Sequence, residues 1–187
     1  MPALNARPTY LKLLPCPIDR KLPTVQVVFG ENFDDEKKLV YIHGTVDTGA
    51  ALTIGSLTFF AYICKLFPWI VEEIIVAKPG GYSETLLSGM VSSDSEGVTM
   101  ASLPVLFKLK MSYFTADGER TYLKVACGKH VSCNFLLGAP FLKGTKAKLD
   151  YGLDVVECAG LTAPGNVFKM DYRIPKLISD SGLPSSP

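Results

Sequence analysis

The chain has 187 residues, which suits one domain with short extensions or at most two very small domains. Hydrophobic residues make up 48% and charged residues 20% of the sequence, so a packed core is expected and a collagen-like or disordered chain is excluded. The net charge is only +1, and a chain without a basic surplus gives no reason to expect nucleic acid as a partner.

One uncharged stretch, residues 48–64, has nearly the length of a membrane span. It contains threonines and glycines and is followed by Lys65 and Pro68, so we interpret it as a buried loop and a core helix, not as a span. Residues 1–20 lack a continuous apolar segment, so no secretory signal is expected. Five cysteines without a dense framework favour a reduced protein in the cytoplasm.

Turn signals divide the chain into short apolar or alternating segments. Residues 1–21 are rich in proline and are expected to form an extension, and the Ser-, Gly- and Pro-rich residues 178–187 a frayed tail. One helix is expected at 57–67, ended by Pro68, and a single helical turn at 140–145. The remaining segments predict an all-β barrel or sandwich, with strands at 25–29, 39–46, 73–77, 86–91, 98–109, 122–126, 135–137 and 147–156.

The strongest motif is Val46-Asp47-Thr48-Gly49-Ala50, which follows a predicted strand. A second motif, Leu136-Leu137-Gly138-Ala139-Pro140-Phe141-Leu142, is followed by Leu149-Asp150-Tyr151. Together the motifs and the order of elements between them resemble the retropepsin-like aspartic proteases. The amino-acid sequence of the second motif is most similar to the protease domains of long-terminal-repeat retrotransposons. The resemblance implies a closed β-barrel with one short helix and a flap hairpin. It places the protease domain at 22–158, between extensions at 1–21 and 159–187.

The Asp-Thr-Gly loop has a chemical rationale of its own. Two carboxylates about 3 Å apart cannot both ionise, so they share a proton, and one acts as base while the other acts as acid on a water molecule. Thr48 offers a hydroxyl to fix the loop, and Gly49 allows a backbone N–H to approach the Asp47 carboxylate. Ala50 completes the loop, and the resemblance places Leu136, Leu137 and Gly138 beneath it as support.

The chemistry requires a second aspartate. Asp180 lies in an Asp-Ser-Gly sequence, but only five residues follow it, too few for the strands that surround Asp47. We therefore expect a symmetric homodimer in which each chain supplies Asp47 across a two-fold axis. The edges of strands at 22–29 and 147–158 are expected to add to the interface because they would otherwise be unpaired.

The family closes over its substrate with a flap, and the best match is a hairpin at 86–100 with a polar tip at 92–97. A mobile, exposed hairpin of this kind suits that role. This tip lacks the glycine-dense pattern of the compact retroviral enzymes, so an ordinary surface hairpin is the alternative. The residues expected to reach the substrate are Gly89, Met90, Val91, Gly97 and Val98.

Two other groups of side chains are of types that can carry chemistry. Cys127, His130 and Cys133 have short metal-like spacing but no fourth ligand nearby, so we expect structural cysteines and no metal site. His43 alternates with apolar residues on the strand before Asp47 and is given no catalytic role. No cofactor is expected.

The sequence thus predicts a homodimeric aspartic endopeptidase that cuts extended peptides, within the polyprotein that encodes it. One alternative is a retropepsin-like barrel retained as a catalytically silent dimerisation or peptide-binding module, because fold does not imply function. A more distant alternative is a regulatory proteolytic domain of a cellular protein.

Overall fold

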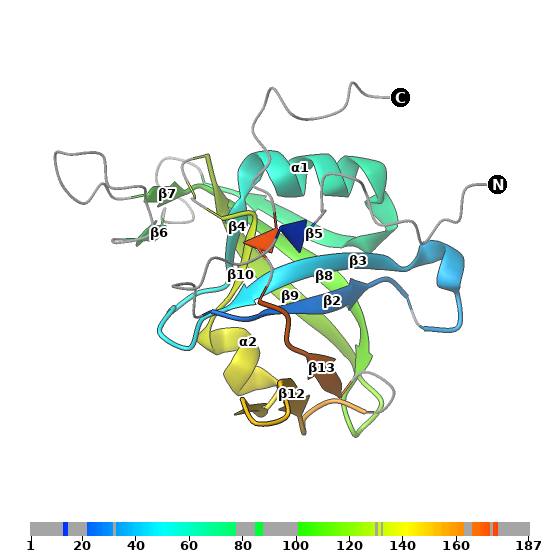
Figure 1. Cartoon of the computed structure of the whole chain (residues 1–187). Coiled ribbons are helices and arrows are strands. Elements are labelled where there is room, and N and C mark those ends of the chain that lie inside the picture. Colours follow the sequence, from blue (N-terminus) through cyan, green and yellow to red (C-terminus); the bar gives the residue numbers. More distant parts are fainter. Residues whose placement is uncertain are drawn as a thin grey trace, which may run out of the picture.

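The computed structural model describes residues 13–14, 22–31, 33–77, 85–87, 101–129, 131, 133–162, 166–172 and 174–175. These residues are mostly β, with few helices (Figure 1). The elements are β1 (Leu13–Leu14), β2 (Thr24–Phe29), η2 (Glu36–Lys38), β3 (Val40–Val46), β4 (Ile54–Ser56), α1 (Leu57–Leu66), η3 (Pro68–Ile70), β5 (Val71–Val76), β6 (Thr85–Leu87), β7 (Ala101–Leu103), β8 (Val105–Phe114), β9 (Arg120–Gly128), β10 (Phe135–Leu137), α2 (Ala139–Gly144), β11 (Ala147–Asp150), β12 (Val155–Cys158), β13 (Val167–Lys169) and β14 (Ile174–Pro175).

Six strands form a closed barrel in the order β2-β3-β10-β4-β9-β8, and pairing of β8 with β2 closes it. Strand β5 continues the sheet along β8, outside the closed ring. In Figure 1 α1 lies on one side of the barrel, whereas α2 and strands β12 and β13 lie on the other. The prediction of an all-β closed barrel is therefore confirmed.

Alternating residues fill the barrel. In β2 the side chains of Val25, Val27 and Phe29 are buried in the core, and Phe60 of α1 packs against Phe135 of β10 at a ring distance of 5.3 Å. The helix begins after Ser56, whose hydroxyl accepts a hydrogen bond from an N–H of the first turn, as N-cap residues do. Among the described residues, no helix combines the length and the apolar character that crossing a bilayer requires.

Charged side chains cover the seam where the barrel closes. Gly30 donates its N–H to the carbonyl oxygen of Lys110, and the Glu31 carboxylate pairs with Lys110 at 3.0 Å and with Arg120 at 3.1 Å. The hydrogen bond from Lys110 is the main reason that the pKa of Glu31 lies below its ordinary value. These contacts join β2 to β8 and β9 beyond the last strand pairing, Phe29 with Met111.

Two expected strands are each divided in the structure. The segment 98–109 contains β7 and the start of β8, separated at Pro104, which has no N–H for a strand ladder. The segment 147–156 is a hairpin of β11 and β12, because Asp154 adopts a positive φ of 52° and the Asp150 carboxylate accepts two N–H bonds from the turn. The three-residue strand β4 was not predicted, since it is shorter than any alternation pattern.

The described residues after 158 pack against the barrel. Strand β13 pairs with β12, and the side chains of Phe168 and Met170 are only 4% exposed in the main core. Thr24 and Asp171 exchange two backbone hydrogen bonds, of 2.6 and 2.8 Å. The expected domain limits at residues 21 and 158 stay predictions, although the core of the barrel includes side chains from both sides of position 158.

The expected unpaired edges are a wrong prediction for β2 and β12, but not for β11. Strand β2 pairs with β3 on one side and, at its two ends, with Asp171 and β8 on the other. Strand β12 lies between β11 and β13, so it too has neighbours on both sides. Within the described part of the chain, the outer edge of β11 remains without a strand partner.

Candidate active site

The Asp47 loop connects β3 to β4, and a single strand lies between these two. Strand β10 runs parallel to β3, with Leu137 opposite Val46, and antiparallel to β4, with Leu136 opposite Ile54. Both ends of the loop are therefore fixed by one strand that comes much later in the sequence (Figure 1).

Hydrogen bonds orient the Asp47 carboxylate. The backbone N–H of Asp47 donates to the carbonyl oxygen of Leu137 at 3.0 Å, and the N–H of Gly49 donates to Oδ1 of Asp47 at 2.9 Å. The Asp47 side chain is half-buried, whereas Thr48 and Gly49 are exposed. A Cβ at position 49 would lie 3.4 Å from Oδ1, an ordinary contact, so within one chain this glycine is not required by the carboxylate.

The Leu-Leu-Gly segment lies directly against the loop, and its glycine is required there. A Cβ at position 138 would overlap the carbonyl oxygen of Leu52 and lie 2.8 Å from that of Ala50. The N–H of Gly138 donates to the Thr53 hydroxyl at 3.2 Å, and the N–H of Ala139 donates to the Ala50 carbonyl at 2.8 Å. These bonds hold the loop and its support in a fixed relation.

Leu136 and Leu137 point to opposite faces of the sheet, as neighbours in a strand do. Leu137 is buried in the barrel core, and Leu136 belongs to a separate apolar cluster under the loop. This cluster, called here the loop-support cluster, consists of Ile54, Leu103, Ala126, Val131 and Leu136, with Ala50, Leu52, Leu106 and Cys133 packed against it.

The loop-support cluster also anchors the base of the expected flap. Strands β6 and β7 form an antiparallel hairpin in which Thr85 is opposite Leu103, and the Leu103 side chain is fully buried in the cluster. The base of the hairpin and the Asp47 loop therefore share one apolar support. The substrate-contacting candidates at the hairpin tip lie outside the described residues, namely Gly89, Met90, Val91, Gly97 and Val98.

Two of the described cysteines, Cys127 and Cys133, have thiols whose pKa is raised by burial. Burial raises the pKa of the Cys133 thiol to about 12, with a further contribution from the negative charge of Asp47. Cys127 is fully buried in the barrel core, and burial raises its pKa as well, so both thiols stay protonated near neutral pH. His130 lies outside the described residues, and the part of the chain that is described contains no metal-like group of three such side chains.

Two residues near the loop, Thr53 and Leu103, were not expected from the sequence, and Cys133 was considered only as a candidate metal ligand. Thr53 accepts the Gly138 N–H, and its only signal was a hydroxyl residue within an apolar run. Leu103 carried no signal, and the spacing that drew attention to Cys133 did not indicate its position beside the loop, because both positions depend on tertiary packing. His43, to which no catalytic role was assigned from the sequence, is buried on β3 and lines a cavity that Asp47 does not line.

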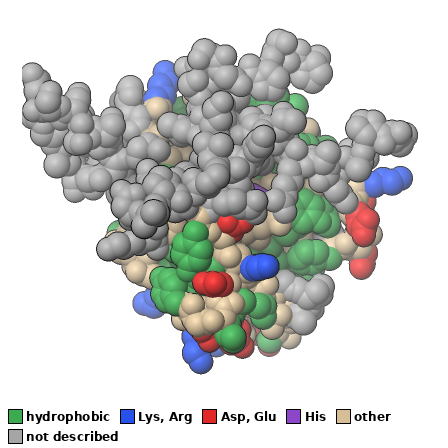
Figure 2. All heavy atoms as spheres, in the orientation of Figure 1, with side chains coloured by type: hydrophobic (Ala, Val, Ile, Leu, Met, Phe, Trp, Pro, Cys, Tyr) green, Lys and Arg blue, Asp and Glu red, His purple; other side chains and the backbone are tan. Residues whose placement is uncertain are grey.

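Asp47 lines neither of two cavities in the structure, which have volumes of about 400 and 330 Å³. The described part of the face drawn in Figure 2 carries acidic and basic side chains beside hydrophobic ones. No protein-family model matches this chain, and no curated protein matches it either.

Proposed function

We propose that the protein is an aspartic endopeptidase that cleaves extended peptide segments. The observation that carries the proposal is the Asp47 loop: an N–H of the loop donates to the carboxylate, and one strand secures the loop at both ends. A solvated turn would need neither the strand between β3 and β4 nor the tight packing of Gly138 against the loop backbone.

The proposed active unit is a symmetric dimer. Among the residues that the structure describes, we assign this setting to Asp47, and the exposed Thr48 and Gly49 leave the tip of the loop accessible to the same loop of a second chain. An isologous contact of this kind would place two Asp47 carboxylates side by side across the two-fold axis. The catalytic centre would then be built by the interface itself.

In the proposed reaction one carboxylate takes a proton from a water molecule while the other donates a proton to the carbonyl oxygen of the scissile amide. The extended substrate would lie between the Asp47 loop and the β6–β7 hairpin. Such a pair is active while it holds one proton, so the rate should fall at both low and high pH. Cleavage of a polyprotein is the proposed role, and the four described cysteines, all free thiols, are in keeping with an intracellular setting.

The decisive experiment compares the wild type with Asp47→Asn. The amide has the shape of the carboxylate but cannot share a proton, so cleavage of a casein or peptide substrate at mildly acidic pH should fall by at least about 10³-fold. Asp117→Asn, in an exposed turn, is the matched control and should keep full activity. A statine-type inhibitor should abolish the wild-type activity.

The thermal melting of both variants should match that of the wild type. A well-folded Asp47→Asn protein that still cleaves the substrate, with contaminating protease excluded, would refute the proposal. If the wild type itself forms a dimer and binds peptides without cleaving them, the silent binding module is the correct assignment.

A further inference from the structure

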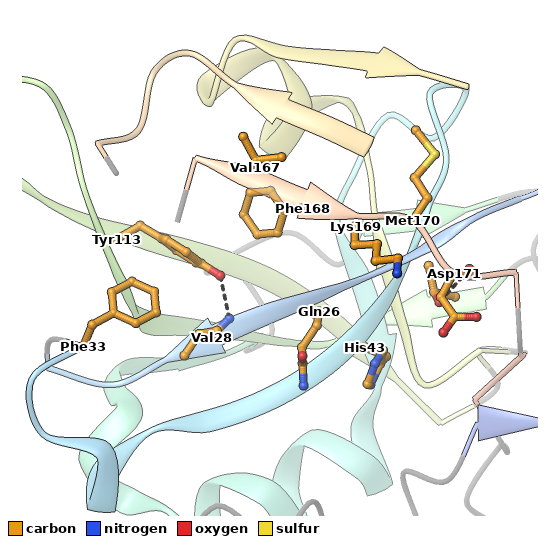
Figure 3. Close-up of a pocket in the computed structure, with 11 residues that line it drawn as sticks. Gln26, Val28, Phe33, His43, Tyr113, Val167, Phe168, Lys169, Met170 and Asp171 are labelled. Carbon is orange, nitrogen blue, oxygen red and sulfur yellow. Dashed lines mark hydrogen bonds between the residues drawn. The ribbon is translucent and has the colours of Figure 1, made fainter. Parts of the chain in front are cut away.

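The cavity of about 400 Å³ lies on the outer face of strands β2 and β3, and Asp47 is not among the residues that line it (Figure 3). Its volume of about 400 Å³ is within the range of sites that bind small ligands. Residues 167–171 form one wall, and these come after the part of the chain that resembles a protease. The cavity is therefore not part of the proposed active site.

The cavity lies along the edge of β2 that faces away from β3. At each end of this edge β2 contacts a neighbouring segment, but in the middle of the edge the two segments diverge from β2. Val46 donates its N–H to the Pro23 carbonyl, so in the alternating ladder the backbone groups of Thr24, Gln26 and Val28 face away from β3. Thr24 bonds to Asp171, and Val28 donates its N–H to the Tyr113 hydroxyl at 3.0 Å. The space between these two contacts is the cavity.

Tyr113 supplies a hydrogen-bond donor at one end of this space. Tyr113 is only 3% exposed. Burial raises the pKa of its phenol, so the hydroxyl stays protonated. The hydroxyl oxygen accepts the Val28 N–H, while its own proton has no acceptor in the described part of the chain. Because Tyr113 lines the cavity, its hydroxyl proton can be donated to an oxygen atom of a ligand that enters there.

The walls combine an aromatic end with a charged end. Phe33, Tyr113 and Phe168 line the cavity beside the donor, and the ring of Tyr113 packs at 5.4 Å from each of the other two, so this wall is aromatic although little of Tyr113 and Phe168 is exposed. At the other end Lys169 is exposed and makes no ion pair with the described residues. In Figure 3 its ammonium group lies on the cavity side of β13, across from β2.

We infer that this cavity binds a short peptide segment that carries an aromatic residue and a carboxylate. The aromatic side chain packs against Phe33 and Phe168, the preceding carbonyl oxygen accepts the Tyr113 proton, and the carboxylate pairs with Lys169. One lysine beside Asp171 is a poor site for a phosphate, which favours several cations, so a carboxylate is the better match. The site is separate from Asp47 and does not depend on the proposed proteolysis.

The test is an NMR titration of the full chain with small probes. N-acetyl-phenylalanine should produce saturable shifts in the amide signals of Gln26, Val28 and Phe168. N-acetyl-alanine, which lacks the ring, and N-acetyl-phenylalanine amide, which lacks the carboxylate, should each bind at least about fivefold more weakly. A further probe is a dipeptide amide with aspartate after the phenylalanine, which carries its carboxylate on a side chain. If this probe binds more tightly than N-acetyl-phenylalanine, the natural carboxylate is that of a side chain; if it binds more weakly, the natural carboxylate is that of a chain terminus.

Variants separate the contributions. Lys169→Met should bind the acid and the amide of acetyl-phenylalanine equally well, whereas Lys148→Met, at an exposed position of β11, should keep the preference for the acid. Tyr113→Phe should weaken every probe that has the acyl carbonyl, with thermal melting as the check that the variant is folded. Asp47→Asn should bind all probes as the wild type does, which keeps this result independent of proteolysis.

The inference is overturned by either of two results. One is the absence of saturable shifts at the three amides at probe concentrations of tens of millimolar. The other is binding that is the same in wild type, Lys169→Met and Tyr113→Phe, because the ligand would then lie elsewhere on the molecule.

Discussion

At the scale of single residues, Gly138 is the position where the candidate site has least room. A side chain there would meet backbone atoms of residues 50 and 52, which cannot move aside as a flexible side chain can. Gly138→Ala should therefore destabilise the protein by at least about 2 kcal/mol, and proteolysis should fall with it because the Asp47 loop is displaced. Urea unfolding, followed by circular dichroism, measures the first effect.

Gly144 provides the control for this variant. Nothing lies within 4 Å of a Cβ at position 144, so Gly144→Ala should change the free energy of unfolding by no more than about 0.5 kcal/mol. Equal stability of the two variants would mean that the loop backbone yields to the added methyl group.

Some residues of the candidate site could be predicted from the sequence, and others could not. Asp47 and Gly138 lie in local motifs, and their proximity to each other was expected from the family that these motifs resemble; the structure places the two segments in contact. Thr53 and Leu103 could not be identified in this way. Their importance comes from a hydrogen bond and a packing contact between segments that are distant in sequence.

At the scale of elements, the seam between β2 and β8 depends on pH through Glu31. The pKa of Glu31 is lowered from its ordinary value of 4.5 in the folded protein. The ion pairs of Glu31 therefore stabilise the fold at pH values above 4.5, and this contribution is lost as the pH falls through the lowered pKa. Glu31→Gln should cost no more than about 1 kcal/mol at neutral pH, because the side chain is 43% exposed and solvent screens it. At about pH 3 the variant and the wild type should be equally stable.

Urea unfolding at the two pH values measures the difference. Glu73→Gln, on the exposed face of β5, should have no effect at either pH. A cost for Glu31→Gln that persists at acid pH would show that packing of the side chain, and not its charge, joins the strands.

The elements were predictable where a strand is long enough to alternate. Strands β2, β3 and β9 and helix α1 were expected within a few residues of their observed limits, whereas the three-residue β10 was expected from its Leu-Leu-Gly motif. The β11–β12 hairpin was missed because its turn depends on a positive φ at an aspartate, which the alternation of flanking residues conceals. Strand β13 was missed because three residues carry no period, and partners elsewhere in the chain define it as a strand.

At the scale of the whole molecule, the residues after 158 contribute to the stability of the barrel. Phe168 is buried against Tyr113 and Phe141, so Phe168→Ala should destabilise the protein by about 3–5 kcal/mol. The neighbouring Val167 is 55% exposed, and Val167→Ala should fall within about 0.5 kcal/mol of the wild type. Denaturant midpoints compare the two, and a wild-type midpoint for Phe168→Ala would place β13 outside the cooperative unit.

The proposed activity also has a molecular-scale signature. If two chains build one catalytic centre, specific activity should fall when the protein is diluted below the dissociation constant of the dimer. Sedimentation over the same concentrations should show the dimer giving way to monomer, with an inert carrier protein added to exclude losses to surfaces. Constant specific activity in a monomeric sample would require a second carboxylate within the chain.

The strand that separates β3 from β4 has a consequence for synthesis. The hydrogen bond between Gly138 and Thr53 joins residues 85 positions apart, so the Asp47 loop leaves the ribosome long before its support. At about 5–20 residues per second, the loop waits about 4–17 seconds for its partner strand. A nascent chain that has not yet reached β10 carries the aspartate without the geometry proposed for cleavage, which delays any proteolysis until β10 has been synthesised.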